Sequence, residues 1–276
     1  MRELRGLTAL VTGASGGIGR YIARELARAG MNVVVSGRRE DALAAAVGEL
    51  RVIGVRAEAV VAELSDLGQA ESLIDRSEAA LGPLDVLVNN AGVEYVAAFT
   101  QYTREELISS ININLTAPLL MTRHVVPAML ARGRGHAVFI ASVAGKVGPA
   151  YEEPYAASKA GLIALTQSLR AEYRKAPVGF SVVCPGFVAG DGMYQRMVQQ
   201  GVMSNRLMGT TTPGRIAEKV VEAIRRDVPE VIESGAPIRP MLALSQLAPR
   251  LVDRIAPQIG LTEFFRRAAV ARGRSS

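Results

Sequence analysis

Cysteine, histidine and tryptophan are scarce in this sequence of 276 residues, which has one cysteine, two histidines and no tryptophan. A single cysteine allows no disulfide within the chain, and this fits a reducing compartment, the cytoplasm. Cys184 stands in an apolar run that predicts a strand, so we interpret it as a small buried hydrophobic residue rather than a reactive thiol. His124 and His136, without clustered cysteines, supply too few groups for a zinc site or for serine–histidine–aspartate chemistry.

Long hydrophobic runs are also missing. No stretch of about 18 apolar residues is present, so we expect no membrane span. The charged start, Met1–Arg5, leads directly into a predicted strand, and we therefore expect no signal peptide. Apolar residues nevertheless make up 49% of the chain and charged residues 21%, a balance that suits a folded domain with a sizeable core and argues against general disorder.

Acidic residues are scarce at the end of the chain. Between Ala236 and Ser276, seven arginines stand against two acidic residues, so this segment has a net charge of +5 out of +6 for the whole chain. Its leucines and isoleucines alternate with arginine, which predicts a basic amphipathic extension. We consider three roles for it: a cover for the active site or a subunit contact, a peripheral contact with an anionic membrane surface, and a loosely ordered tail.

Short apolar runs alternate along the chain with segments of helical periodicity. The predicted strands are Leu7–Thr12, Met31–Ser36, Val55–Val61, Asp85–Asn89, Ala137–Ala141, Val178–Cys184 and Val231–Ser234. The predicted helices are Gly17–Ala29, Glu40–Arg51, Leu67–Leu81, Thr103–Ala131, Pro154–Lys175 and Pro213–Arg226, with Pro118 and Pro127 interrupting the fourth. This alternation predicts an α/β fold, a doubly wound, Rossmann-like parallel sheet of about seven strands with helices on both faces.

Unusual residues follow six of the predicted strands, where an open parallel sheet binds its ligands. The first strand leads into Thr12-Gly-Ala-Ser-Gly-Gly-Ile-Gly19, and the fourth into Asn89-Asn-Ala-Gly92. In the first of these, Gly13 allows a sharp turn, Gly17 allows close approach of a pyrophosphate and Gly19 allows the helix to pack on the strand. The helix that follows would direct its first amides at the phosphates. An ordinary strand-to-helix turn is the simpler interpretation of these glycines taken alone.

Taken together and in order, these motifs resemble those of the short-chain dehydrogenase/reductase family. The resemblance rests on Thr12–Gly19, on Asn89–Gly92, on Tyr155 with Lys159 four residues later, and on Pro185-Gly186. It covers roughly residues 5–235 and implies an oxidoreductase. Two further residues match the positions where that family keeps a catalytic serine and asparagine, namely Ser142 and Asn114.

The predicted catalytic residues are Asn114, Ser142, Tyr155 and Lys159. Tyr155 would act as the general acid in reduction and the general base in oxidation. Lys159 lies one helical turn later on the same face, and its ammonium, with the positive nicotinamide, would favour the phenolate. Lowering the phenol pKa from about 10 to about 7 requires about 4 kcal/mol. Ser142 would bind the substrate oxygen, and the resemblance implies that Asn114 holds a water that connects Lys159 to solvent.

The residues after the second strand favour NADP(H) over NAD(H). An acidic side chain there would bind the adenosine ribose hydroxyls, but Gly37 stands in that place and is followed by Arg38 and Arg39, which suit a phosphate. A solvated turn is the alternative. The residues expected at the cofactor are Gly13, Ser15, Gly17, Ile18, Gly19, Arg38, Arg39, Glu63, Leu64, Asn90, Ala91, Gly92, Tyr155, Lys159, Pro185, Gly186 and Val188.

Three places depart from the family pattern or lie outside it. Glu63 stands where the family usually has an aspartate that binds the adenine amine. Gly190 stands where the family often has a threonine that contacts the carboxamide, so we assign that contact to Val188 and to the backbone. Glu94 and Tyr95 either line the substrate site or belong to the surface.

We therefore expect residues 1–235 to form the catalytic domain, with a methionine-rich substrate lid at about 191–212, followed by the extension over 236–276. The expected substrate is a small hydrophobic carbonyl or alcohol, and no metal is expected. The resemblance implies a homodimer or homotetramer built on the helices Thr103–Ala131 and Pro154–Lys175. We expect no nucleic-acid partner, because no aromatic residues alternate with the arginines of the extension. The alternatives are a sensor that binds NAD(P) without turnover and an NAD-dependent alcohol dehydrogenase.

Overall fold

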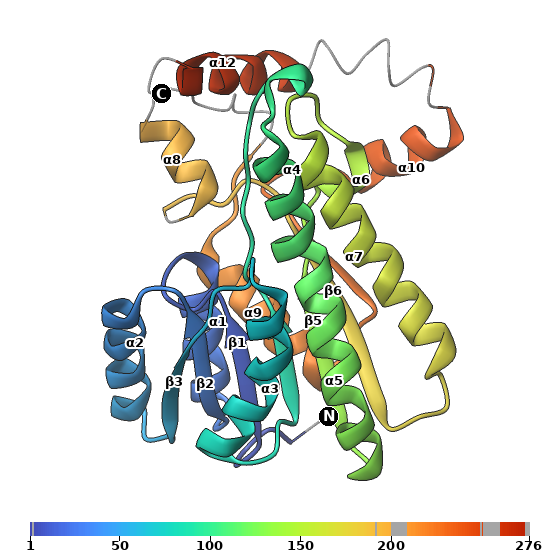
Figure 1. Ribbon diagram of the computed structural model, residues 1–276. Coiled ribbons are helices and arrows are strands. Elements are labelled where there is room, and N and C mark those ends of the chain that lie inside the picture. Colours follow the sequence, from blue (N-terminus) through green and yellow to red (C-terminus); the bar gives the residue numbers. More distant parts are fainter. Residues whose placement is uncertain (2, 191, 200–208, 249, 251–259, 274–276) are drawn as a thin grey trace.

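Parallel strands form the centre of the structure, a computed structural model that describes residues 1, 3–190, 192–199, 209–248, 250 and 260–273 (Figure 1). The strands are β1 (Thr8–Thr12), β2 (Asn32–Gly37), β3 (Ala57–Val61), β4 (Val86–Asn89), β5 (Gly135–Ile140), β6 (Val178–Pro185) and β7 (Glu230–Glu233). They pair in the order β3-β2-β1-β4-β5-β6-β7, and every pairing is parallel. The predicted seven-stranded parallel sheet is thus confirmed.

Helices connect successive strands and cover both faces of the sheet (Figure 1). They are α1 (Gly17–Arg28), α2 (Glu40–Val52), α3 (Leu67–Leu81), η1 (Phe99–Gln101), α4 (Arg104–Ile111), η2 (Asn112–Thr116), α5 (Ala117–Ala131), α6 (Ala144–Val147), α7 (Glu153–Glu172), α8 (Met193–Gln199), α9 (Pro213–Arg226), α10 (Arg239–Leu247) and α12 (Leu261–Gly273). Helices α1, α2 and α9 contribute to the core on one face, and α3, α5 and α7 to the core on the other.

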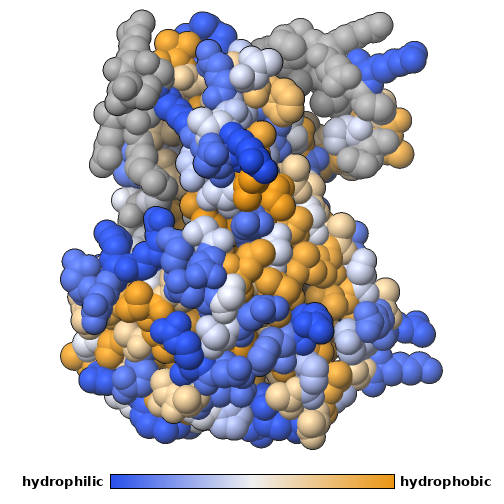
Figure 2. All heavy atoms as spheres, in the orientation of Figure 1, coloured by the Kyte–Doolittle hydropathy of each residue, from blue (hydrophilic) through white to orange (hydrophobic). Residues whose placement is uncertain are grey.

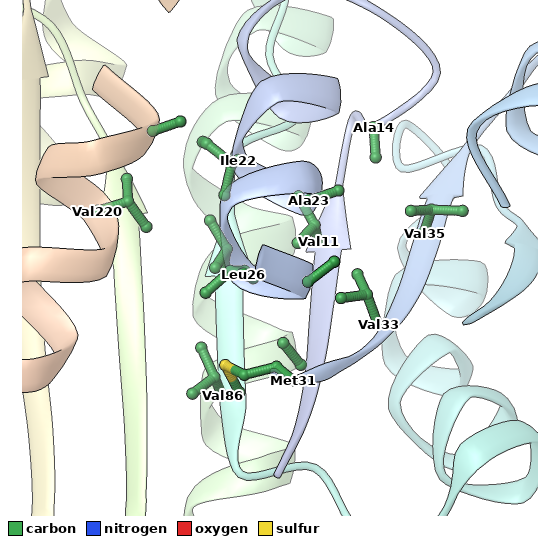
Figure 3. Packing of buried hydrophobic residues seen from close by; sticks show 14 of the residues in the cluster. Val11, Ala14, Ile22, Ala23, Leu26, Met31, Val33, Val35, Val86 and Val220 are labelled. Carbon is green, nitrogen blue, oxygen red and sulfur yellow. The ribbon is translucent and has the colours of Figure 1, made fainter. Parts of the chain in front are cut away.

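The alternating direction of strand side chains divides the core into these two layers. In β1, Val11 packs in the layer with α1 and α9, while its neighbour Leu10 packs in the layer with α3 and α5. Figure 3 shows Val11 of β1, Leu26 of α1 and Val220 of α9 meeting in the first layer. Strands buried on both sides explain the continuous apolar runs in the sequence.

The order of the strands fixes where a ligand can bind. The chain builds β1, β2 and β3 outward in one direction and then returns to place β4 on the other side of β1. The connections on the two sides of this point lead to opposite faces, which leaves a crevice beyond the carboxyl ends of β1 and β4. The glycine turn after β1 and the segment Asn89–Gly92 after β4 meet at that crevice.

The prediction for Thr103–Ala131 was right about a helical segment but wrong about what interrupts it. Thr103 begins it with a capping box, in which its hydroxyl accepts from the Glu106 amide and the Glu106 carboxylate accepts from the Thr103 amide. The interruption is the π-helical turn η2, which ends before Pro118, and Pro127 lies inside α5 without ending it. Because Pro118 has no amide hydrogen for the carbonyl four residues earlier, a wider turn just before it is a natural adjustment.

The lid and the extension are described in part. The structure has α8 and residues 209–212 from the expected lid, and α10 and α12 from the extension, whereas 191, 200–208, 249, 251–259 and 274–276 lie outside the described residues. In Figure 1, α12 lies near α8 at the end of the molecule away from the N-terminus. Among the described segments, no helix combines the length and the apolar character that crossing a membrane requires.

The packing predicts which leucines stabilise the fold. Leu26 is fully buried in α1, and Leu247 at the end of α10 is 85% exposed. We expect Leu26→Ala to lower the free energy of unfolding by about 2–5 kcal/mol, because it leaves a cavity in the core. The same truncation at Leu247 should change it by no more than about 0.5 kcal/mol. Urea unfolding measures both, and similar losses for the two variants would contradict the assignment of the core.

Candidate active site

The carboxyl ends of the strands open into a cavity of about 1480 Å³. Almost every residue predicted for the site lines it. Those that do are Gly13, Ser15, Gly17, Ile18, Arg38, Arg39, Glu63, Leu64, Asn90, Ala91, Gly92, Ser142, Tyr155, Lys159, Pro185, Gly186 and Val188. The two exceptions, Gly19 and Asn114, lie directly behind the wall. The cavity is larger than a typical site for one small ligand, so a dinucleotide and a substrate can lie in it together.

The glycine turn after β1 allows neighbouring backbone segments to approach it closely. Gly13 has a φ of +69°, and a Cβ there would lie 2.8 Å from the Cα of Ala91. A Cβ on Gly19 would lie 2.4 Å from the carbonyl oxygen of Gly13, so α1 can pack on the turn only with glycine. Since α1 begins at Gly17, its first amides and the positive end of its dipole face the cavity. These residues fit the pyrophosphate of a dinucleotide.

A polar brace joins the ends of β1 and β4. The Thr12 hydroxyl accepts from the amides of Asn90 and Ala91 at 3.0 and 3.1 Å. In return, the Asn90 side chain donates to the Thr12 carbonyl at 2.8 Å. The brace fixes the glycine turn against the segment after β4, and the lining of the cavity at this point is therefore rigid.

Two arginines border the part of the cavity beyond β2. Arg39 donates to the carbonyl of Ser15 in the glycine turn at 2.6 Å, and Arg38 donates to the Glu63 carboxylate at 3.3 Å. Partial burial acts to raise the pKa of Glu63, but hydrogen bonds from Ser65 and the charge of Arg38 outweigh it and lower that pKa. Glu63 faces the cavity, as predicted. It also forms an ion pair with Arg38, which the sequence did not predict.

Ser142, Tyr155 and Lys159 meet at the other end of the cavity. Ser142 follows β5, where its hydroxyl accepts from the Ala144 amide at 3.1 Å. Tyr155 and Lys159 come from α7, and the Lys159 ammonium donates to the carbonyl of Ile140 at 2.8 Å. Its Nζ lies 5.5 Å from the centre of the Tyr155 ring. The structure thus brings together the three side chains that the sequence predicted as a unit.

The electrostatics of this trio are dominated by burial. Burial raises the pKa of Tyr155 well above its ordinary value, the charges of Glu94 and Glu152 raise it further, and a hydrogen bond with Ser142 offsets part of the rise. Burial lowers the pKa of Lys159 to about 8. In the protein by itself the phenol is therefore protonated at neutral pH. The lowering expected from Lys159 together with the positive nicotinamide concerns the complex with oxidised cofactor and stays a prediction.

Asn114 lies in the π-helical turn behind the trio and is fully buried. Its side-chain oxygen accepts from the Val93 amide at 2.8 Å, and its side-chain nitrogen donates to the Val93 carbonyl and to Ser158. A Cβ on Gly92 would lie 3.2 Å from the Asn114 oxygen and 3.4 Å from the Lys159 nitrogen. Asn114 therefore holds the segment after β4 next to Lys159.

Aromatic rings form one wall of the far end of the cavity. Phe187, after β6, lies 5.2 Å from the ring of Tyr194 in α8 and 5.3 Å from that of Phe264 in α12. Phe187, Tyr194 and the next residue of α12, Phe265, line the cavity. The two phenylalanines of the extension are thus buried in a cluster with α8, and their rings are not available for stacking on nucleic-acid bases.

The structure also locates the remaining sequence candidates. Glu94 lines the cavity. The ring of Tyr95 instead lies beneath the guanidinium of Arg272, whose Cζ is 5.7 Å from the centre of the ring. Val188 pairs with Thr211 in an isolated bridge that closes the base of the expected lid. Sequence reasoning missed Glu152 and Phe265; the helical spacing from Tyr155 signals the first, whereas no local pattern signals the second.

Comparisons with known proteins agree with this geometry. The profile of the short chain dehydrogenase family matches residues 7–200. The ketoacyl reductase HetN of Nostoc sp. is 40% identical over 277 residues, which cover 99% of this chain and 96% of HetN.

Two solved structures share the fold. A short-chain dehydrogenase/reductase from Burkholderia phymatum in complex with NAD has a TM-score of 0.80 at 27% identity, over 91% of this chain and 96% of that one. The actinorhodin polyketide ketoreductase with NADPH has a TM-score of 0.77 at 32% identity, over 85% of this chain and 98% of that one. With its fold, its motifs and its sequence all in agreement, the chain belongs to the short-chain dehydrogenase/reductase family of oxidoreductases.

Proposed function

We propose that this protein catalyses NADP(H)-dependent hydride transfer between the nicotinamide and the carbon of a carbonyl or secondary alcohol, with reduction of a ketone as its main direction. The observation that carries the proposal is that Ser142, Tyr155 and Lys159 line the same cavity as the glycine turn. A protein that only senses the dinucleotide has no need for a proton donor at that place.

The chemistry follows from the positions of the three side chains. When bound, the reduced nicotinamide supplies the hydride that the carbonyl carbon receives. Ser142 hydrogen-bonds the carbonyl oxygen and stabilises the negative charge that develops there. Tyr155 gives its proton to that oxygen, and the ammonium of Lys159 stabilises the phenolate left behind. Burial raises the pKa of Tyr155, so in the protein by itself the phenol carries the proton that reduction requires. Asn114 acts as a positioning residue, because it fixes the segment next to Lys159.

The substrate end of the cavity supports a partly apolar carbonyl compound. Phe187, Tyr194 and Phe265 form its aromatic wall, and HetN, named as a ketoacyl reductase, suggests a ketone on an acyl chain. Residues 1–235 then serve as the catalytic domain with the lid at 191–212, and the extension over 236–276 closes the substrate end through α12.

Removal of the Tyr155 hydroxyl tests the proposed function. We expect Tyr155→Phe to lower kcat with NADPH and acyl-chain ketones by about 10²–10⁴-fold while NADPH still binds, because only the proton donor is lost. Tyr173→Phe is the matched control: Tyr173 follows the same helix, packs on Phe180 and is not part of the cavity wall. NADPH oxidation followed at the nicotinamide absorbance measures both. Equal rates for Tyr155→Phe and the parent protein would show that the role is wrong.

The preference for NADP(H) rests on Arg38 and Arg39. Both line the cavity beside Ser15, and the position before them is Gly37, which carries no carboxylate to repel a phosphate. Guanidinium groups in this place would form charge-assisted hydrogen bonds with the 2′-phosphate of the adenosine ribose. The NADPH-bound ketoreductase supports this preference, whereas the Burkholderia structure contains NAD.

Loss of one arginine should separate the two cofactors. We expect Arg38→Ala to raise KM for NADPH about tenfold or more, because a charged hydrogen bond is lost, and to leave KM for NADH nearly unchanged. Arg28→Ala, which removes an exposed arginine from the end of α1, should change neither value. Steady-state kinetics with both reduced cofactors measure the difference, and an equal rise for NADH and NADPH would rule out phosphate recognition by Arg38.

We also propose a homo-oligomer that uses α4 and α5. Ile108, Ile111 and Leu119 are exposed on these helices. Figure 2 shows hydrophobic residues gathered on this side of the molecule. Exposed apolar groups in one area commonly mark a protein contact.

Light scattering checks the oligomer. The parent protein should have a mass of at least twice 29.3 kDa, and Leu119→Arg should reduce it to that of one chain, because a charge would be buried in the contact. Val52→Arg, at an exposed position of α2, serves as the control and should keep the parent mass. A parent protein that is monomeric would exclude the proposed assembly.

A further inference from the structure

One buried carboxyl group in the cavity has no part in the chemistry described above. Glu152 immediately precedes α7, and it shares a helix face with Tyr155 and Lys159, three and seven residues later. Its side chain lines the cavity, yet the residue is only 1% exposed. Glu152 therefore lies one turn from the phenol, on the side away from Lys159.

A second carboxyl group, that of Glu94, forms a hydrogen bond with the Glu152 side chain. Glu94 comes from the segment after β4 and lines the same cavity. Two carboxyl groups in contact in a buried place cannot both be ionised, so one proton is shared between them. Burial first, and then the neighbouring Glu94, raises the pKa of Glu152 well above its usual range.

Structural roles do not account for Glu152. Although it occupies the N-cap position of α7, its side chain makes no capping hydrogen bond to the helix amides. Among the described residues, no N–H group or cation bonds to its carboxyl, and its Oε1 has no hydrogen-bond donor. Leaving a buried polar group without a partner destabilises the fold, so an apolar side chain would be more stable here unless a ligand supplies the donor.

We propose that Glu152 is a specificity-determining residue, whose carboxyl oxygen accepts a hydrogen bond from an O–H or N–H group that the substrate carries next to its reacting carbonyl. The inference rests on the proposed function and names its substrate class, which is ketones with a neighbouring hydroxyl or amine. The position one helical turn from Tyr155 places this contact beside the reacting oxygen, while the aromatic wall receives the apolar remainder of the substrate.

Three matched ketones test this proposal. Hydroxyacetone and aminoacetone carry an O–H and an ammonium N–H beside the carbonyl, and methoxyacetone has an ether there with no donor. Their dissociation constants are measured by ligand-observed NMR on the full-length protein loaded with NADP⁺, which cannot reduce them. We expect the two donors to bind about tenfold or more tightly than methoxyacetone, because each satisfies a buried acceptor oxygen that otherwise has no donor.

Three variants identify the group responsible. Glu152→Met has a similar length and no carboxyl oxygen, so its three dissociation constants should become equal. Glu152→Gln keeps one acceptor oxygen and, like the protonated carboxyl, carries no charge, so it should retain the preference for both donors. Glu153→Gln is the matched control, because Glu153 is the next carboxyl in the chain, lies outside the cavity lining and accepts from the Tyr151 amide. It should behave as the parent does.

The two proposals fail in different ways. If the parent binds the three ketones equally, or if Glu152→Met keeps the preference for the donors, then the role of Glu152 is wrong even if the protein reduces ketones. If the preference appears and depends on Glu152, but NADPH is not oxidised with any ketone, the specificity contact stands and the proposed reduction fails.

Discussion

Burial of a phenol and an ammonium in one cavity is the constraint from which the proposed chemistry of this protein follows. Lys159 is 3% exposed, and its cost of burial is offset by a hydrogen bond to the Ile140 carbonyl at the end of β5. That bond fixes α7 against the sheet and so places Tyr155, one turn earlier, beside Ser142. A buried phenol remains protonated at neutral pH, and in the proposed reaction this proton goes to a carbonyl oxygen that gains charge.

The rest of the fold serves to keep this pair beside a bound dinucleotide. The reversal of strand order between β1 and β4 opens the crevice. The brace between Thr12 and Asn90 joins the two strand ends, and the glycines of the turn allow the closest approach. On the far side, α12 returns from the end of the chain to add Phe265 to the substrate wall. The proposed phosphate cradle and the proposed proton donor thus lie at one edge of the same sheet.

Most of this arrangement could be predicted from local sequence patterns. Strand-length apolar runs gave the sheet, and the spacing of Tyr155 and Lys159 placed both on one face of a helix. Two features could not be predicted, for different reasons. The π-helical turn at Asn114 depends on how Pro118 is accommodated, and the contact between Phe187 and Phe264 joins residues far apart in the chain. The direction of the Tyr155 pKa also depends on burial, which a sequence does not measure.

The protonation state of Tyr155 is the most direct test of this account. Tyrosine labelled with ¹³C at Cζ reports whether a phenol is neutral or ionised, and comparison with the spectrum of Tyr155→Phe assigns the signal. In the protein without added cofactor, the Tyr155 signal should still be that of a neutral phenol at pH 10, the ordinary pKa of tyrosine. A signal that titrates near neutral pH would contradict the claim that burial keeps the proton on Tyr155.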